Sequence, residues 1–167
     1  MDPDAKKTAL RMIPYGLYVL TARDQDGEIA AATINWVTQA SFEPSLVVAG
    51  VKRDSHSYEV LKRAGHFALN VLGKGQHDLA FTFFKPAEVD GDKISGVGWR
   101  EGAAGQVILE GLPAWVVCRV VDVRADGDHA IVVGEVIDAG VEGAIEGRPD
   151  DATLWLRDLG ENVFYGG

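Results

Sequence analysis

Polar and apolar side chains alternate with a period of two between residues 32 and 42, and this pattern favours extended β-structure. Odd positions carry the hydrogen-bonding side chains of Thr33, Asn35, Gln39 and Ser41, with Val37 among them. Even positions carry Ala32, Ile34, Trp36, Ala40 and Phe42, with Thr38 as the polar exception. Two interpretations remain open: an ordinary half-exposed antiparallel strand, or a sheet face that offers donors and acceptors to a polar heterocycle.

An apolar run at residues 46–51 follows, and it leads into a short basic turn that carries two serines. The run predicts a buried strand, and residues 55–64 predict a short helix that begins with good capping chemistry. The unpaired N–H groups and positive dipole end of such a helix, with two hydroxyls and two cations, form a candidate phosphate site. The alternative is a capped surface helix with a solvated charge cluster. The candidate residues are Lys52, Arg53, Ser55, His56 and Ser57.

The rest of the chain reads as short strands joined by turns. We expect strands at residues 17–21, 28–36, 67–72, 107–109, 114–124 and 129–139, a brief helix at 74–84, and a long loop at 88–105. Trp99 in that loop is either a lid aromatic or an anchor for the loop. Short strands with few helices predict a closed or nearly closed antiparallel barrel, and 167 residues predict a single domain spanning 1–167.

Composition and missing motifs exclude several functions. A net charge of −9 argues against a general surface for nucleic acid or anionic membranes, which would need excess Lys and Arg. The sequence has no signal-peptide or membrane-spanning run, and we expect a soluble cytoplasmic protein. The only cysteine, Cys118, lies in an apolar run and predicts a buried, inert thiol. The chain lacks a Rossmann fingerprint, a Walker loop and common metal-ligand spacings, so no metal site is predicted.

Five sequence patterns carry a family resemblance. They are Tyr-Gly-Leu-Tyr-Val-Leu-Thr at 15–21; Ala-Thr-Ile-Asn-Trp at 32–36 with Gln39, Ser41 and Pro44; Ser55-His56-Ser57; Gly-His-Phe-Ala-Leu-Asn-Val-Leu at 65–72; and Gly127-Asp128-His129. In this order and spacing the chain resembles the flavin reductase-like family, which includes flavoredoxins and the reductase components of two-component monooxygenases. Two features depart from the reductases: Trp36 is bulkier than the small residues common there, and residues 162–167 look closer to flavoredoxin-like members.

The resemblance implies a mainly β fold, an antiparallel six-stranded Greek-key split barrel that binds FMN and has a few short helices. It implies an NAD(P)H-dependent flavin oxidoreductase that binds FMN, or alternatively FAD, and passes hydride-derived electrons to flavin or to a partner protein. The alternative is a flavoredoxin-like electron-transfer or structural module without NAD(P)H turnover of its own. A homodimer and a monooxygenase or electron-transfer partner are also implied.

The resemblance also implies roles for individual residues. Along the flavin ring it places Thr33, Ile34, Asn35, Trp36, Val37, Thr38 and Gln39, with Ser41 near the ring edge. At the phosphate it places Ser55 and Ser57 beside His56, and Lys52 or Arg53 would balance the phosphate charge. Asn35 and Gln39 can each donate and accept, which suits the pyrimidine edge of the ring. His129 is the candidate catalytic residue near the reacting face, and its alternative role is to cap a turn.

Overall fold

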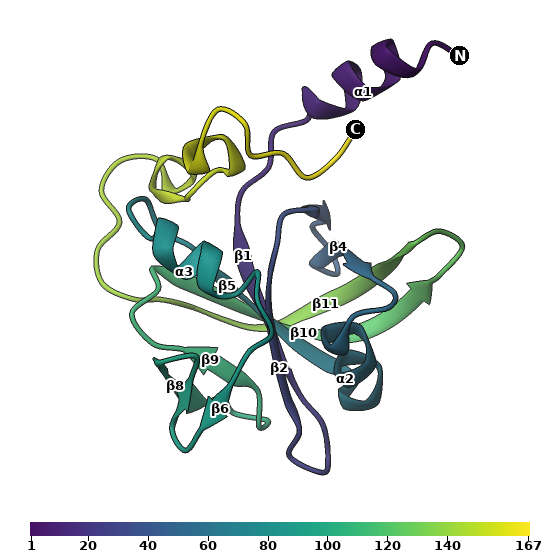
Figure 1. The fold of residues 1–167 in the computed structure, drawn as a ribbon. Coiled ribbons are helices and arrows are strands. Elements are labelled where there is room, and N and C mark those ends of the chain that lie inside the picture. Colours follow the sequence, from purple (N-terminus) through teal and green to yellow (C-terminus); the bar gives the residue numbers. More distant parts are fainter.

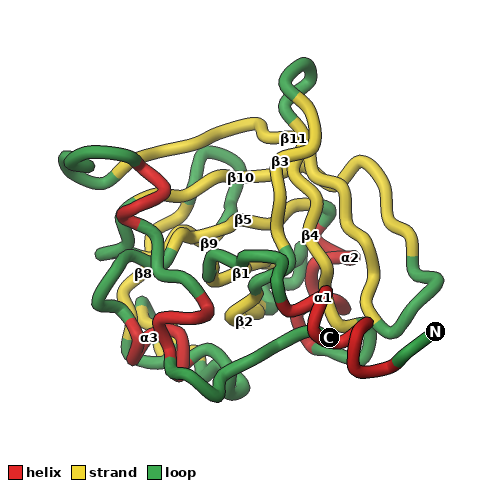
Figure 2. The backbone as a smooth tube through the Cα atoms, turned by 90° about the horizontal axis from the view of Figure 1, so that it is seen from above, coloured by secondary structure: helices red, strands yellow, loops and turns green.

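A computed structural model describes all residues from 1 to 167, and its strands form two antiparallel sheets (Figure 1). The larger sheet has seven strands in the order β2-β1-β5-β10-β11-β4-β3, and the smaller has four in the order β6-β7-β8-β9. The strands of the larger sheet are β1 (Tyr18–Arg23), β2 (Ile29–Ile34), β3 (Val37–Ser41), β4 (Leu46–Lys52), β5 (His66–Val71), β10 (Ala114–Arg124) and β11 (His129–Val141). Those of the smaller sheet are β6 (Val89–Asp90), β7 (Lys93–Ile94), β8 (Val97–Glu101) and β9 (Val107–Leu109). Viewed from above, the larger sheet is curled rather than flat (Figure 2).

Three α-helices and two 3-10 turns complete the chain. They are α1 (Pro3–Arg11), α2 (His56–Ala64), α3 (His77–Thr82), η1 (Pro149–Ala152) and η2 (Leu156–Leu159). Helix α1 buries no residue and projects from the body of the molecule beside the C-terminus (Figure 1). Helix α2 is amphipathic, because it buries Tyr58, Val60 and Leu61 while Glu59, Lys62 and Arg63 face solvent.

Two hydrophobic clusters hold these elements in place. One joins α2 to the larger sheet and includes Leu20, Tyr58, Leu61 and Phe67. The other packs β1, β9, α3 and η2 together around Leu17 and Phe83. The clusters fix the ends of β2, β4 and β11 relative to the start of α2.

The expected mainly antiparallel fold with a few short helices is confirmed. Strands β4, β5, β9, β10 and β11 and helices α2 and α3 lie within a few residues of their predicted positions. The larger sheet nevertheless has seven strands instead of six. Cys118 is fully buried, as expected, and burial raises the pKa of its thiol to about 12.

Two sequence expectations on local structure are wrong, and one helix was not predicted. The period-two segment is not one strand, because β2 ends at Ile34, β3 begins at Val37, and the two strands lie at opposite ends of the sheet order. Residues 88–105 are not a plain loop, since they contain β6, β7 and β8. Trp99 lies within β8 and packs against the second cluster, so it anchors this small sheet. Helix α1 was not anticipated, because it has no face buried in the core.

The helices of this structure are all too short or too polar to cross a membrane. No group of three or more His, Cys, Asp or Glu side chains is arranged to hold a metal ion.

Candidate functional site

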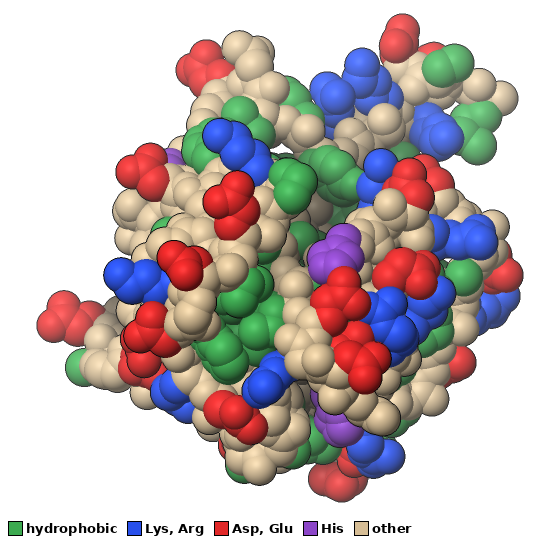
Figure 3. Space-filling view, turned by 60° about the horizontal axis from the view of Figure 1, so that its bottom comes forward, with side chains coloured by type: hydrophobic (Ala, Val, Ile, Leu, Met, Phe, Trp, Pro, Cys, Tyr) green, Lys and Arg blue, Asp and Glu red, His purple; other side chains and the backbone are tan.

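A cavity of about 200 Å³ lies where β2, β4 and β11 meet the start of α2, and we call it the helix-start cavity. Seven of the residues predicted for the site line it: Thr33, Ile34, Asn35, Lys52, Ser55, Ser57 and His129. The sheet register brings them together, because His129 pairs with Lys52 and the chain turns directly from β4 into α2. The remaining lining residues are Ala32, Gly50, Val51, Phe83, Phe84 and Tyr165. In the space-filling view, hydrophobic side chains gather in hollows while charges of both signs are mixed around them (Figure 3).

One end of the helix-start cavity carries available hydrogen-bond donors. Ser55 caps α2: its hydroxyl accepts from the N–H of Tyr58 at 3.2 Å, and its carbonyl accepts from the N–H of Glu59. The first N–H groups of a helix have no partner within it, so those of His56 and Ser57 stay available. Ser57 is 5 % exposed, lines the cavity, and its hydroxyl makes no hydrogen bond to another residue. This end of the cavity can hold an anion.

Two cations lie beside this end, with different degrees of pairing. The Nζ of Lys52 lies 3.2 Å from the carboxylate of Asp54, which offsets part of its charge. Arg53 donates to the carbonyl of Gly127 at 3.0 Å and has no carboxylate within ion-pair distance. Its positive charge is therefore uncompensated and adds to the positive dipole end of α2.

The other end of the cavity is aromatic and centres on His129. The imidazole Nδ1 lies 2.9 Å from an oxygen of Asp128, and Nε2 lies 2.7 Å from the hydroxyl of Tyr165. The Trp36 ring packs against the rings of His129 and Tyr165, at centroid distances of 4.6 Å and 5.3 Å. The hydrogen bond from His129 lowers the pKa of the Asp128 carboxyl, and burial raises the pKa of the Tyr165 hydroxyl.

Gly50 allows the Trp36 ring to take this position. A Cβ atom at residue 50 would lie 3.0 Å from Cε3 and 3.2 Å from Cβ of Trp36, tighter than ordinary van der Waals contact. The backbone adds to the fit, because the N–H of Gly50 donates to the carbonyl of Trp36 at 2.8 Å. The bulky Trp36 is thus accommodated by a glycine on the neighbouring strand β4.

Asn35 and Thr33 are already bonded within the protein. Asn35 is 5 % exposed and donates through Nδ2 to the carbonyl of Tyr165 at 3.1 Å. The Thr33 hydroxyl donates to the carbonyl of Ala80 at 2.9 Å and fastens β2 to α3. The side-chain carbonyl of Asn35 remains free to accept a hydrogen bond.

The other seven predicted residues lie outside the helix-start cavity. Val37 and Thr38 line an adjoining hollow together with Trp36. Gln39 is exposed and donates to the carbonyl of Ser41, farther along β3. Arg53 lies on the outer surface of the turn, and His56 points to Glu28 on the far side of α2, 3.6 Å away.

Sequence reasoning did not assign Phe83, Phe84 or Tyr165 to the site. Phe83 and Phe84 line the cavity because α3 ends beside β2, where the N–H of Thr33 donates to the carbonyl of Phe83 at 3.0 Å. Tyr165 lies 36 residues beyond His129, and no local pattern links the two. The aromatic residues at the end of the helix predicted at 74–84 gave a partial signal for Phe83 and Phe84 but none for Tyr165.

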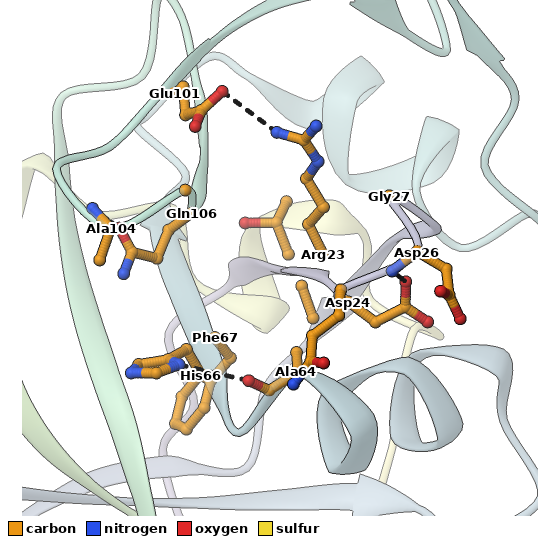
Figure 4. A pocket seen from close by; sticks show the side chains of 14 residues that line it. Arg23, Asp24, Asp26, Gly27, Ala64, His66, Phe67, Glu101, Ala104 and Gln106 are labelled. Atoms are coloured by element: carbon orange, nitrogen blue, oxygen red, sulfur yellow. Dashed lines mark hydrogen bonds and ion pairs between the residues drawn. The ribbon is translucent and has the colours of Figure 1, made fainter.

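A second polar cavity, of about 560 Å³, lies at the tip of the β1–β2 hairpin, and we call it the hairpin cavity. Figure 4 shows its lining: Arg23 reaches toward Glu101, Asp24 faces the hairpin backbone, and His66 lies beside Phe67. Arg23 and Glu101 form an ion pair at 3.1 Å. Asp24 accepts hydrogen bonds from the N–H groups of Asp26 and Glu28 and from Arg63. Arg23 and Glu101 are thus paired within the lining and Asp24 with Arg63 outside it, while the Nε2 of Gln106 is buried without a partner.

Comparison with known proteins identifies relatives along almost the whole chain. A sequence model of the "flavin reductase like domain" family matches residues 10–158. A flavin reductase of Pseudomonas putida is 35 % identical over 94 % of this chain and 88 % of its own length. The reductase subunit of stachydrine N-demethylase from Rhizobium meliloti is 33 % identical over 81 % of this chain and 57 % of its own length. A probable flavin reductase of the same organism is 36 % identical, and the chain spans only 42 % of its length.

Solved structures agree with these relatives. An NADH:FAD oxidoreductase of Streptomyces globisporus C-1027 superposes with a TM-score of 0.72 and 30 % sequence identity, covering 85 % of this chain and 86 % of its own. Another structure of that oxidoreductase holds fragments of NAD and FAD. The similarity therefore extends from the sequence to the curled antiparallel fold.

Proposed function

The chain belongs to the flavin reductase like domain family, and from this membership we propose that it is an oxidoreductase that binds flavin and reduces it with NAD(P)H. Relatives named as flavin reductases and as the reductase subunit of a demethylase support this activity. We infer FMN as the preferred flavin, because the helix-start cavity offers one anion site beside one aromatic end.

The observation that carries the proposal is the hydroxyl of Ser57 at the start of α2, which faces the helix-start cavity and bonds to no other residue. A hydroxyl that faces a cavity without a partner in the protein can donate to a ligand with acceptor oxygens. The free N–H groups of His56 and Ser57 and the ammonium group of Lys52, which lines the cavity, match the charge of a phosphate. The residues present thus fit the phosphate end of a flavin mononucleotide.

The aromatic end of the cavity fits a planar heterocycle. Phe83 and Phe84, which follow α3, supply flat apolar surfaces, and Trp36 packs behind His129, while the free side-chain carbonyl of Asn35 can accept a hydrogen bond from a ring N–H. When bound, the flavin would supply the redox chemistry by accepting a hydride from a nicotinamide. The protein would orient the two rings and exclude water, and His129 would lie where it can contact the reacting face.

We further propose that the reduced flavin serves a monooxygenase and that the protein is a homodimer. The demethylase reductase subunit among the relatives supports an oxygenase partner. The exposed helix α1 and the exposed apolar residues Met12, Ile13 and Phe42 are compatible with contact between two copies. Sedimentation of the purified protein tests the dimer, since a single 17.9 kDa species would contradict it.

Titration with FMN and with riboflavin tests the binding proposal. Riboflavin has the same ring system but no phosphate, so the protein should bind FMN at least about tenfold more tightly, as expected for hydrogen bonds to a charged group. Quenching of flavin fluorescence gives both affinities. Equal affinities for FMN and riboflavin would contradict a phosphate site at the start of α2.

A further inference from the structure

The last three residues of the chain separate two hollows. Tyr165 lines the helix-start cavity, whereas Gly166 and Gly167 line an adjoining hollow of about 890 Å³, which we call the tail groove. Trp36 and Thr38 are among the other residues of the tail groove, and Gly50 borders both hollows. Displacement of the tail would therefore join them into one larger space.

Tyr165 contacts the groups that the proposed function assigns to the flavin ring. Its ring centroid lies 5.3 Å from that of Trp36 and 5.8 Å from that of His129. Its hydroxyl bonds to His129 Nε2 at 2.7 Å, and its backbone carbonyl accepts from Asn35 at 3.1 Å. A planar aromatic group with a polar edge thus already occupies the aromatic end of the site.

Beyond the contacts of Tyr165 in the site and of Val163 with the second hydrophobic cluster, the tail is held by surface contacts. Arg11 of α1 donates to the carbonyl of Gly166 at 3.2 Å, and its guanidinium lies 4.3 Å from the ring centroid of Phe164. Phe164 is 52 % exposed and Tyr165 is 43 % exposed, so neither side chain belongs to the core. Contacts of this kind are individually weak, which makes the tail able to leave its position without unfolding the protein.

We propose that residues 162–167 form a displaceable plug, in which Tyr165 occupies the place of the flavin ring until flavin displaces it. The proposal rests on the proposed function, because it concerns the same site. The present cavity of about 200 Å³ is smaller than the roughly 300–1,000 Å³ of typical ligand pockets, and displacement of Tyr165 would open it toward the tail groove of about 890 Å³. Flavin binding and closure of the tail are then mutually exclusive.

Flavin binding by Tyr165→Ala tests the plug. A competing closed state lowers the apparent affinity in proportion to its population, so removal of the Tyr165 ring should strengthen FMN binding and accelerate association, each by about tenfold. Tyr165→Phe keeps the ring but loses the hydrogen bond to His129, and it should lie between the parent and Tyr165→Ala. Ile137→Ala is the control: Ile137 of β11 is 45 % exposed, lines neither hollow, and its loss should leave association unchanged.

A second measurement follows the tail directly. Saturating FMN should raise the rate of backbone hydrogen exchange in residues 162–167, because bound flavin expels the tail from the site. Unchanged or weaker FMN binding by Tyr165→Ala, with a parent protein that binds FMN, would overturn the plug and leave the proposed function standing. Absence of FMN binding by both the parent and Tyr165→Ala would overturn both proposals.

Discussion

The helix-start cavity and the hairpin cavity differ in which of their groups remain available to a ligand. In the hairpin cavity, Arg23 is paired with Glu101, and Asp24 accepts from two backbone N–H groups and from Arg63, so the main charges are paired while the buried Nε2 of Gln106 has no partner. In the helix-start cavity, by contrast, the Ser57 hydroxyl and the first N–H groups of α2 have no partner. The hairpin cavity is the larger of the two, at about 560 Å³ against about 200 Å³.

The difference shows that volume and polarity alone do not locate a binding site. A group that is already bonded gains little by exchanging its partner for a ligand, because the old bond is lost when the new one forms. The same charges that make the hairpin cavity polar therefore stabilise the hairpin rather than recruit a ligand. The available donors at the start of α2 favour the smaller cavity as the flavin site.

Substitution of Ser57 should produce the largest effect on flavin binding. A hydrogen bond to a charged group is worth roughly 1.5–3 kcal/mol, so Ser57→Ala should weaken FMN binding by about tenfold or more. Ser57→Asp should weaken it further, because it places a carboxylate beside the phosphate. The fold should tolerate the aspartate, since acidic residues are favourable in the first turn of a helix.

The hairpin cavity supplies the control for this change of charge. Gln25→Glu adds one negative charge to an exposed residue of that cavity and should leave FMN affinity unchanged. Equal weakening by Ser57→Asp and Gln25→Glu would mean that overall charge, rather than a phosphate site, governs binding. If both Ser57 variants bind FMN as tightly as the parent does, the turn before α2 only caps the helix and does not bind the phosphate.

His129→Ala should affect reduction more than binding. We place this side chain at the reacting face and away from the phosphate, so hydride transfer should slow by about 100-fold, the lower end of the range for single positioned groups. FMN should bind at least as tightly as to the parent. The start of α2, which we assign to the phosphate, is untouched, and loss of the hydrogen bond to His129 makes Tyr165 easier to displace. Stopped-flow traces without oxygen measure both quantities, and an unchanged reduction rate would remove His129 from the site.

Asp24→Asn should affect stability without affecting FMN. The carboxylate connects the hairpin to Arg63 of α2, and its neutralisation should lower the melting temperature by a few degrees, on the order of 2–4 °C. FMN affinity should remain that of the parent. A change in affinity would show that the hairpin cavity communicates with the flavin site, and the contrast between the two cavities would fail.

The pH dependence of that stability difference gives the smallest expected effect. The hydrogen bond from Arg63 lowers the pKa of Asp24 below its ordinary value of 3.8. Its contribution is therefore present above pH 3.8 and is lost as the pH falls below 3.8 through the lowered pKa. The gap in melting temperature between the parent and Asp24→Asn should narrow over this acidic range, and a gap that widens there would contradict the assignment.

Local signals in the sequence predicted most of the elements, since they depend on neighbouring residues. The cap at Ser55 and the long strand at Ala114–Arg124 are examples, because capping chemistry and apolar patterns act over a few residues. Helix α1 could have been found from Asp2 and Pro3, which are a favourable cap and a favourable first helical residue. Its lack of a buried face removed the usual apolar signal.

Long-range contacts could not be predicted in the same way. The alternation from residue 32 to 42 continues in phase across the turn at Asn35 and Trp36, so it does not reveal that two strands are involved. Nor does any spacing link Tyr165 to Asn35, 130 residues earlier. The family resemblance predicted which residues form the site, whereas the structure shows which of them line the same cavity.

Anaerobic reduction of the FMN-loaded protein by NADH and by NADPH tests the central claim most directly. If the chain binds flavin at the start of α2 and receives a nicotinamide on the open face of the ring, the visible absorbance of the flavin should bleach. The rate should saturate with nucleotide concentration for at least one of the two donors. Saturable bleaching is the predicted result, and a flavin that stays oxidised with both nucleotides would contradict the proposed reductase activity.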